Sequence, residues 1–233
     1  MSSKKRPRVI LNVAMSADGK IDTVARRGAT ISSLEDKARV DRLRASVDAV
    51  LVGGRTLVRE DPKLTIKSPD LRRRRKAEGR PENPAKIGVV SVADLKPAGA
   101  FLTAGPARKL IFTTRRTLPE QIQKLELAGA EVFVAGEKAV NLNEILHSLS
   151  EMGIRTLMVE GGGTLIAEFL RLKLADELYA YIAPRLFAGG TAPTLADGPG
   201  FMLEQAPRLM LVSVERFDPA GGVLLHYRIR HNP

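Results

Sequence analysis

The sequence contains no cysteine and no tryptophan, only three histidines, and 4% aromatic residues. Without cysteine the chain can form no disulfide, no thiolate metal site and no cysteine nucleophile. His147 lies in the middle of the chain and His226 and His231 lie near its end, so no histidine ligand set for a metal is visible. The few aromatic residues offer few platforms for stacking single-stranded bases. These absences favour a metal-free protein.

Long apolar runs are also missing. No run approaches the roughly 18 residues of a membrane span, and the apolar run at 9–14 is too short for a signal peptide. We therefore expect a cytoplasmic protein without a membrane partner. With 233 residues, 44% apolar and 27% charged, the chain can form one large α/β domain or two small ones. We predict a single domain over 1–233 with a disordered tail over 1–7.

The net charge of +11 is unevenly distributed. Basic side chains dominate the segment 67–86, at Lys67, Arg72, Arg73, Arg74, Arg75, Lys76, Arg80 and Lys86. Such a cluster would attract anions, either nucleic acid or phosphorylated small molecules. The alternative is a solvated surface segment. We predict a basic loop over 67–86.

Short apolar runs alternate with helical patterns along most of the chain. Strands are predicted at 9–14, 47–52, 88–92, 109–113, 131–135 and 155–160, and helices at 34–45, 119–128, 142–152 and 165–174. Further strands at 177–183, 209–216 and 221–230 follow without helices between them, and 218–222 has the composition of a hairpin turn. This order predicts an α/β fold with a mostly parallel sheet, helices on both faces and an antiparallel C-terminal hairpin.

The strongest local signal is a run of glycines between a predicted strand and a predicted helix, at Gly161, Gly162 and Gly163. Glycine lets the backbone approach a ligand closely, and a helix N-terminus presents unpaired N–H groups and a positive dipole end. A pyrophosphate suits such a turn. The pattern is neither G-x-G-x-x-G nor a P-loop, so a tight turn without a ligand is the alternative.

A second glycine turn, Gly53-Gly54, ends the predicted strand at 47–52. Thr56 then supplies a hydroxyl, and Glu60 and Asp61 supply carboxylates. These groups are either ligand contacts or ordinary surface residues.

A third joint follows the first predicted strand, where Ser16 is followed by Asp18-Gly19-Lys20. Alternation places Asn12 on the same face as Ser16, in a strand otherwise suited to burial. A buried amide must be hydrogen-bonded, either to a neighbouring turn or to a ligand.

Together and in order, these segments resemble one family. They are Asn12-x-Ala14-x-Ser16-x-Asp18-Gly19-Lys20, Asp48-x3-Val52-Gly53-x2-Thr56-x3-Glu60-Asp61-Pro62-x-Leu64-Thr65, Glu160-Gly161-Gly162-Gly163-Thr164 and Pro184-x4-Gly189-Gly190-x2-Pro193. The chain is similar, from Arg8 to Arg230, to the riboflavin-biosynthesis reductases: the free-standing diaminopyrimidine reductases of archaea and fungi, and the reductase half of the bacterial deaminase–reductase. The zinc motif of the deaminase half is absent. The resemblance implies a dihydrofolate reductase-like fold and a homodimer.

The resemblance also implies a reaction, in which NAD(P)H delivers hydride to the sugar carbon of a ribosylamino-pyrimidinone 5′-phosphate and ribosyl becomes ribityl. By position, the residues in contact with the cofactor would be Thr56, Glu60, Ser91, Gly161, Gly162, Gly163, Thr164 and Leu165. Leu64 and Lys67 would face the substrate. Asn12 and Glu160 would lie at the reacting sugar, with Glu160 as the proton donor or, alternatively, as a carboxylate stabilised by the helix dipole. The bacterial enzymes tend to have Lys and Arg in place of Asn12 and Lys67, and Asp is the more usual residue in place of Glu60.

The segment Thr113-Thr114-Arg115-Arg116 bears on the type of cofactor. Its hydroxyl and guanidinium groups could bind a 2′-phosphate, and no acidic residue ends the strand to bind a free 2′-hydroxyl. This favours NADPH and leaves NADH possible. Two other interpretations remain: a reductase of the same fold acting on a pterin or related heterocycle, and a basic nucleic-acid-binding module, which would leave the glycine turns unexplained. We expect a phosphorylated pyrimidine–ribose substrate and no nucleic acid.

Overall fold

The computed structural model describes residues 6–231, so most of the predicted tail over 1–7 lies outside the described residues. The contacts divide the chain into two compact units, each described by itself below, and the single domain over 1–233 stays a prediction. Of the described residues, unit 1 contains 6–8 and 41–158, and unit 2 contains 9–40 and 159–231. No helix within the described chain has the length and apolar character to cross a bilayer.

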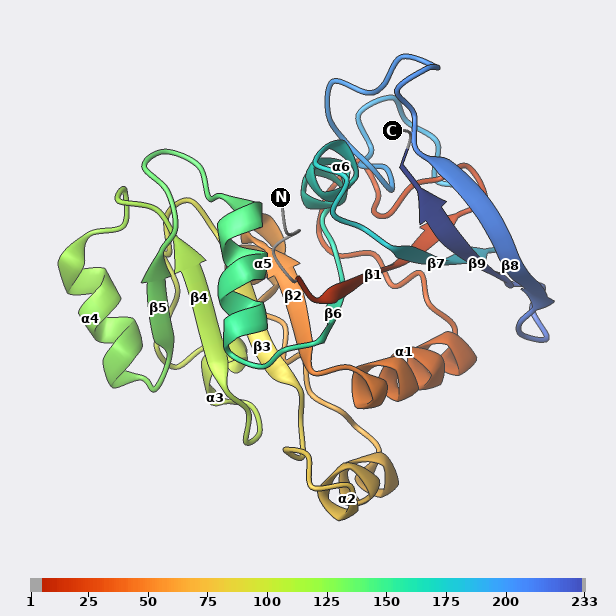
Figure 1. Ribbon diagram of the computed structural model, residues 1–233. Helices are drawn as coiled ribbons and strands as arrows, with labels where there is room; N and C mark the ends of the chain where they lie inside the picture. The colour runs from red at the N-terminus through yellow and green to blue at the C-terminus, as the bar shows by residue number, and fades with distance from the viewer. Residues whose placement is uncertain (1–5, 232–233) are drawn as a thin grey trace. The chain divides into compact units, whose positions relative to one another are not determined.

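Unit 1 is built on parallel strands (Figure 1). β2 (Ala49–Gly53), β3 (Ala85–Val89), β4 (Lys109–Thr113) and β5 (Glu131–Val134) pair in parallel in the order β5-β4-β3-β2, and β6 (Thr156–Val159) adjoins β2. Every residue of β2 is buried, as its unbroken apolar run predicts. Because the strands run in parallel, the carboxyl ends of β2, β3 and β4 share one edge of the sheet.

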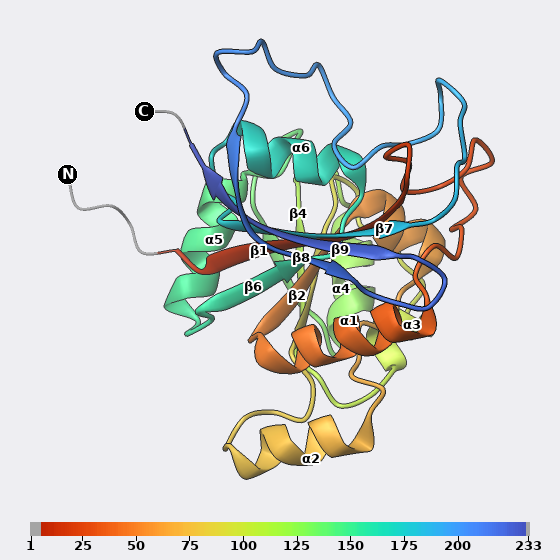
Figure 2. The ribbon, with the colours of Figure 1, turned by 90° about the vertical axis from the view of Figure 1, so that its right-hand side faces the viewer.

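The helices of unit 1 are η1 (Thr56–Glu60, a π-helical turn), α2 (Pro69–Ala77), α3 (Ala100–Thr103), α4 (Pro119–Leu127) and α5 (Leu142–Glu151). Figures 1 and 2 show α4 and α5 on opposite sides of β4. The chain moves outward through α4 from β4 to β5 and returns through α5 to β6. Crossovers between parallel strands are right-handed. Because α4 and α5 connect strands in opposite directions across the sheet, the two helices lie on opposite faces.

The prediction of a loop over 67–86 is wrong for residues 69–77, which form α2. Ser68 Oγ accepts the Leu71 N–H (3.4 Å), and Pro69 occupies the first turn, both typical of a helix start. Three of the four arginines of α2 form ion pairs: Arg72 with Glu82, Arg73 with Asp70 and Arg74 with Glu78. The basic composition suggested a loop because it obscured these pairs, two of which have the helical spacing of three or four residues.

Unit 2 combines a parallel pair of strands with an antiparallel hairpin. β1 (Arg8–Ser16) pairs in parallel with β7 (Glu177–Ala183), β7 pairs antiparallel with β9 (Val223–Arg230), and β9 with β8 (Arg208–Arg216). α6 (Gly163–Arg171) completes the unit. In the hairpin turn, the Asp218 carboxylate accepts the Gly222 N–H (3.0 Å) and the Tyr181 hydroxyl (2.6 Å). The predicted C-terminal hairpin is confirmed.

α1 (Leu34–Ser46) begins in unit 2 and ends in unit 1. Ser33 Oγ accepts the Asp36 N–H (3.1 Å), so Ser33 caps the helix. The acidic residues Glu35 and Asp36 lie in its first turn and Arg44 in its last, which complements the helix dipole.

Candidate active site

The glycine turn Gly53-Gly54 is packed against the end of β3. A Cβ added to Gly54 would lie 2.9 Å from Val90 Cγ2, and Leu57, fully buried, occupies space that a Cβ on Gly88 would need. Small residues therefore let η1 follow β2 directly. This brings half-buried Thr56 and exposed Glu60 to the carboxyl edge of unit 1, where ligands of open α/β sheets bind.

Ser91, two residues beyond β3, lies at the same edge. Its carbonyl oxygen accepts the Thr114 hydroxyl (2.6 Å), and the Thr113 hydroxyl lies 2.6 Å from that of Thr117. Thr113 and Thr114 are fully buried, so their hydroxyls hold this edge together and are not exposed to a ligand, in contrast to the role suggested by the sequence.

The two arginines after these threonines differ in their partners. Arg115 Nε binds Glu137 Oε1 at 2.6 Å, both side chains being exposed. Arg116 is exposed and has no ion-pair partner within residues 6–231. Arg116 is therefore the better-placed free guanidinium for an anion.

The two predicted substrate residues occupy different environments. Leu64 is 2% exposed, with a left-handed φ of 50°, so its side chain belongs to the core of unit 1. Lys67 is exposed. The backbone N–H groups of Lys67 and Ser68 donate to the Asp41 carboxylate (2.7 and 2.8 Å), which fixes the backbone and leaves the Lys67 ammonium accessible.

The glycine turn at 161–163 leads into α6, which begins two residues before the predicted helix start. Gly161 and Gly162 have φ of 111° and 60°, a region that favours glycine. A Cβ on Gly163 would lie 2.4 Å from the Thr194 carbonyl oxygen, and the Asp197 N–H donates to the Gly163 carbonyl (3.1 Å). The turn is thereby held against the loop at 194–197.

The remaining motifs of unit 2 meet at this loop. The Asp18 carboxylate accepts the Ser16 hydroxyl (2.6 Å) and the N–H groups of Phe187 (3.1 Å) and Ala188 (2.8 Å). These hydrogen bonds lower the pKa of Asp18 to about 2, and the bond from Ser16 contributes most. Lys20 forms a β-bridge with Thr194. Segments separated in sequence, at 16–20, 161–163, 187–188 and 194–197, thus converge within unit 2.

Asn12 is 7% exposed and its buried amide is satisfied from α1. Asn12 Oδ1 accepts from Arg39 Nη2 (2.8 Å), and Arg39 Nε donates to Asp36 Oδ1 (2.8 Å). Asp36 and Arg39 are functional candidates that the sequence analysis missed. An acid and a base three residues apart on a predicted helix was the available signal. Glu160, half-buried, directly follows β6.

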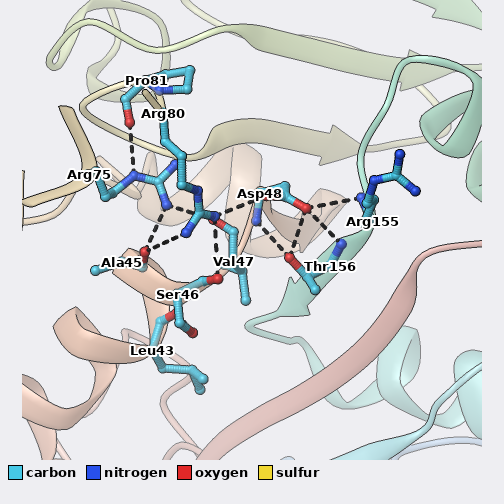
Figure 3. Close-up of polar contacts among 10 residues, drawn as sticks. All are labelled: Leu43, Ala45, Ser46, Val47, Asp48, Arg75, Arg80, Pro81, Arg155 and Thr156. Atoms are coloured by element: carbon cyan, nitrogen blue, oxygen red, sulfur yellow. Dashed lines mark hydrogen bonds and ion pairs between the residues drawn. The ribbon is translucent and has the colours of Figure 1, made fainter. Parts of the chain in front are cut away.

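The opposite edge of unit 1 carries a different polar network (Figure 3). Asp48 Oδ2 accepts the N–H groups of Arg155 and Thr156 (both 3.0 Å) and the Thr156 hydroxyl (2.9 Å), and Asp48 Oδ1 binds Arg80 (2.9 Å). Burial opposes ionisation of Asp48, but these hydrogen bonds prevail and lower its pKa. Asp48 therefore joins the amino ends of β2 and β6, which gives this motif residue a structural role.

Two arginines of the basic segment belong to that network. Arg75, 2% exposed, donates to the carbonyl oxygens of Pro81, Ala45 and Val47 (2.8 Å each), and Arg80 also donates to Val47 (2.8 Å). Burial, and then the charge of Arg80, lower the pKa of Arg75 to about 10. Cations here satisfy the last carbonyl groups of α1. Arg75 is thus neither solvated nor free to attract an anion.

Known structures and sequences resemble this arrangement. The fold is similar to the pyrimidine reductase-like protein from Corynebacterium diphtheriae (TM-score 0.82, 21% identity, 97% of this chain and 93% of that one). It is also similar to RibD of Acinetobacter baumannii, form 1 (TM-score 0.80, 23% identity, 99% of this chain and 60% of that one). At these identities the likeness establishes the α/β fold of the RibD reductase domain.

Sequence similarity defines the family. Residues 7–221 match the model of the RibD C-terminal domain. The chain is 41% identical over 197 residues to the 2,5-diamino-6-ribosylamino-4(3H)-pyrimidinone 5′-phosphate reductase of Archaeoglobus fulgidus, covering 84% of this chain and 89% of that protein. It is 37% identical to the protein of the same name from Methanothermobacter thermautotrophicus, covering 97% and 99%. The chain therefore belongs to the RibD C-terminal domain family, a family of reductases whose fold implies a nicotinamide cofactor.

Proposed function

We propose that this protein is the riboflavin-biosynthesis reductase that converts the ribosyl group of 2,5-diamino-6-ribosylamino-4(3H)-pyrimidinone 5′-phosphate to ribityl with NADPH. The observation that carries the proposal is the 41% identity, over 84% of the chain, to a protein of that name. The reaction adds hydride to sugar carbon C1′, breaks the C1′–O4′ bond and places a proton on O4′. Substrate, NADPH and one proton become the ribityl product and NADP⁺. We place this reaction in the cytoplasm.

The residues present fit a dinucleotide. A Cβ on Gly161 or Gly162 would meet no atom within 4 Å, so the space beside this turn is open to a ligand, and the N-terminus of α6 suits a pyrophosphate. We assign pyrophosphate binding to residues 161–165. Thr56, Glu60 and Ser91 are further cofactor contacts in this proposal. When bound, the nicotinamide supplies the hydride, and the protein needs only to bind, orient and exclude water.

Proton delivery is the remaining chemical task. In the proposal Glu160 donates the proton that O4′ requires, directly or through a water. Asn12 contacts the same sugar, and Lys67 binds the 5′-phosphate as an exposed ammonium. Leu64, being buried, shapes the wall behind the substrate rather than reaching it.

NADPH is proposed over NADH because of Arg116. This guanidinium lies beyond the carboxyl end of β4 and has no ion-pair partner within the described chain, so it is available for a 2′-phosphate. Nucleic-acid binding is disfavoured because the arginines of α2 are already paired or buried.

A homodimer formed through β8 completes the proposal. Four apolar side chains of β8 are about half exposed: Leu209 (46%), Leu211 (52%), Val212 (46%) and Val214 (58%). β8 is also the last strand of its sheet, and an apolar edge strand is a pairing surface unless it is covered. Leu211→Lys should give a monomer in light scattering, whereas a wild-type monomer would exclude the dimer.

The decisive test follows NADPH absorbance with the diamino substrate, its deaminated analogue and the dephosphorylated diamino compound. We expect rapid oxidation only with phosphorylated compounds, fastest with the diamino form. Glu160→Gln should lower kcat by roughly 10²- to 10⁴-fold with an unchanged Kd for NADPH. No NADPH oxidation with either phosphorylated compound would exclude this function, and an unimpaired Glu160→Gln would exclude the proposed proton donor.

A further inference from the structure

We infer that Arg39 is a positioning residue that makes Asn12 an obligate hydrogen-bond donor toward the reacting sugar. The inference rests on the proposed function, which places Asn12 at that sugar. It adds a residue of α1 to the machinery and states what the Asn12 amide contributes.

Asn12 belongs to a row of side chains on one face of the strands of unit 2. In the strand register Asn12 of β1 lies opposite Tyr179 of β7, and Tyr179 lies opposite His226 of β9. The rings of Tyr179 and His226 stack with centroids 4.0 Å apart. The guanidinium carbon of Arg39 lies 6.0 Å from the centre of the Tyr179 ring, so Arg39 spans from the first strand of the row to the second.

The contact between Arg39 and Asn12 settles the orientation of the amide. A guanidinium has only donors, so the group that meets Arg39 Nη2 at 2.8 Å must be the amide oxygen. The amide NH₂ of Asn12 therefore points away from Arg39. Without that contact, rotation by 180° would exchange donor and acceptor at little cost, since the two ends are nearly equal in size.

The position of Arg39 is itself fixed. Its Nε donates to Asp36 Oδ1 at 2.8 Å, and Asp36 is fully buried while Arg39 is 8% exposed. Burying an ion pair is costly and gives little net stability. Asp36 Oδ2 and Arg39 Nη1 are, moreover, buried without hydrogen-bond partners among the described residues. Such unpaired buried atoms are unusual in a pair that serves stability alone, which favours a functional role.

A donor is what the reaction requires at this place. As the C1′–O4′ bond breaks, negative charge develops on O4′ before the proton arrives. The NH₂ group of Asn12 can stabilise that charge, and its oxygen could not. The nearby Arg39 guanidinium also polarises the Asn12 amide, which makes its NH₂ group a stronger hydrogen-bond donor.

The test is a double-mutant cycle in the full-length enzyme, with kcat, KM and NADPH affinity measured for each variant. Arg39→Met should lower kcat by on the order of 100-fold through misplacement of the amide, with unchanged Kd for NADPH. In an Asn12→Ala background the same change should have less than about a twofold effect. Arg42→Met is the matched control, because Arg42 is exposed on the same helix, and it should match wild type.

Asn12→Asp is an independent test of the inference, because the new side chain still accepts a hydrogen bond from Arg39. The carboxylate accepts from the guanidinium but carries no donor, so kcat should fall as far as in Asn12→Ala. Equal losses from Arg39→Met in both backgrounds, or an Asn12→Asp enzyme as fast as wild type, would overturn the inference. If Arg39→Met does not fold, a wild-type crystal structure decides: an Asn12 amide oxygen that does not bind Arg39 overturns it.

Failure of the proposed function looks different. A wild-type protein that oxidises no NADPH with either phosphorylated compound removes the function and the inference together. An active wild type with an impaired Asn12→Ala, but equal effects of Arg39→Met in both backgrounds, removes the inference alone.

Discussion

The two ends of the parallel strands in unit 1 use charge in opposite ways. At the amino ends, Arg75, Arg80 and Asp48 are bound to carbonyl oxygens, N–H groups and one another (Figure 3). At the carboxyl ends, Glu60 and Arg116 are exposed. Hydrogen-bonded charge at the amino ends holds helix ends and strand ends in place, whereas the exposed Arg116, without an ion-pair partner in the described chain, stays available for a ligand. The contrast teaches that a strongly basic segment can serve the fold while a single free arginine serves the ligand.

Arg75→Met should have the largest effect at the amino ends. It removes three hydrogen bonds to carbonyl groups of α1 and its neighbourhood, and we expect the free energy of unfolding to fall by about 3 kcal/mol. Urea denaturation measures it, with Arg73→Met as the exposed control on the same helix. If Arg75→Met keeps its stability but loses kcat, Arg75 serves the reaction rather than the fold, and the contrast between the two ends of the strands is wrong.

Asp48→Asn should cost about 2 kcal/mol, because an amide cannot replace the carboxylate that accepts from Arg155, Thr156 and Arg80. The pKa of Asp48 is lowered in the folded state, so its contribution is present above the ordinary value of 3.8 and is lost as pH falls through the folded value. Unfolding curves of wild type and Asp48→Asn should therefore converge in acid. A constant difference down to that pH range would contradict the assignment.

Lys86 tests the burial of a charge that donates its hydrogen bonds to carbonyl oxygens. Its Nζ donates to the carbonyl oxygens of Phe101 (3.0 Å) and Ala104 (2.5 Å), and burial, then the charge of Lys109, lower its pKa from 10.5 to about 8. The unfolded chain thus binds more protons between these values, and the free energy of unfolding should rise with pH there. Relative to Lys86→Met, wild type should gain about 1–3 kcal/mol from pH 8 to 10.5. If the unfolding free energies of wild type and Lys86→Met change with pH in parallel, the pKa of Lys86 is not lowered in the folded state.

Arg116→Ala should have the smallest effect, confined to the carboxyl ends. We expect NADPH to bind about tenfold more weakly, with NADH affinity and the unfolding free energy unchanged. Arg115→Ala is the matched control, because Arg115 is already paired with Glu137. Equal small effects of both variants on both cofactors, measured by fluorescence titration, would remove the argument for NADPH.

Elements with a local cause were predictable from the sequence. The apolar run of β2, the glycine turn before α6 and the turn at Asp218 depend on side-chain periodicity and on backbone conformations that few residues adopt. Their order indicated the mostly parallel sheet and the hairpin. The helix α2 was missed because its capping and ion pairs compete with a strongly basic composition.

Contacts between distant residues could be known only from the folded chain. Arg74 and Arg75 are adjacent and chemically identical, yet one is exposed on α2 and the other is buried against the end of α1. Asn12 and Arg39 stand 27 residues apart, and no local pattern pairs them. Residue type and spacing encode which conformation a segment prefers, but burial and hydrogen-bond partners depend on which segments pack together, and that is decided by the whole chain at once.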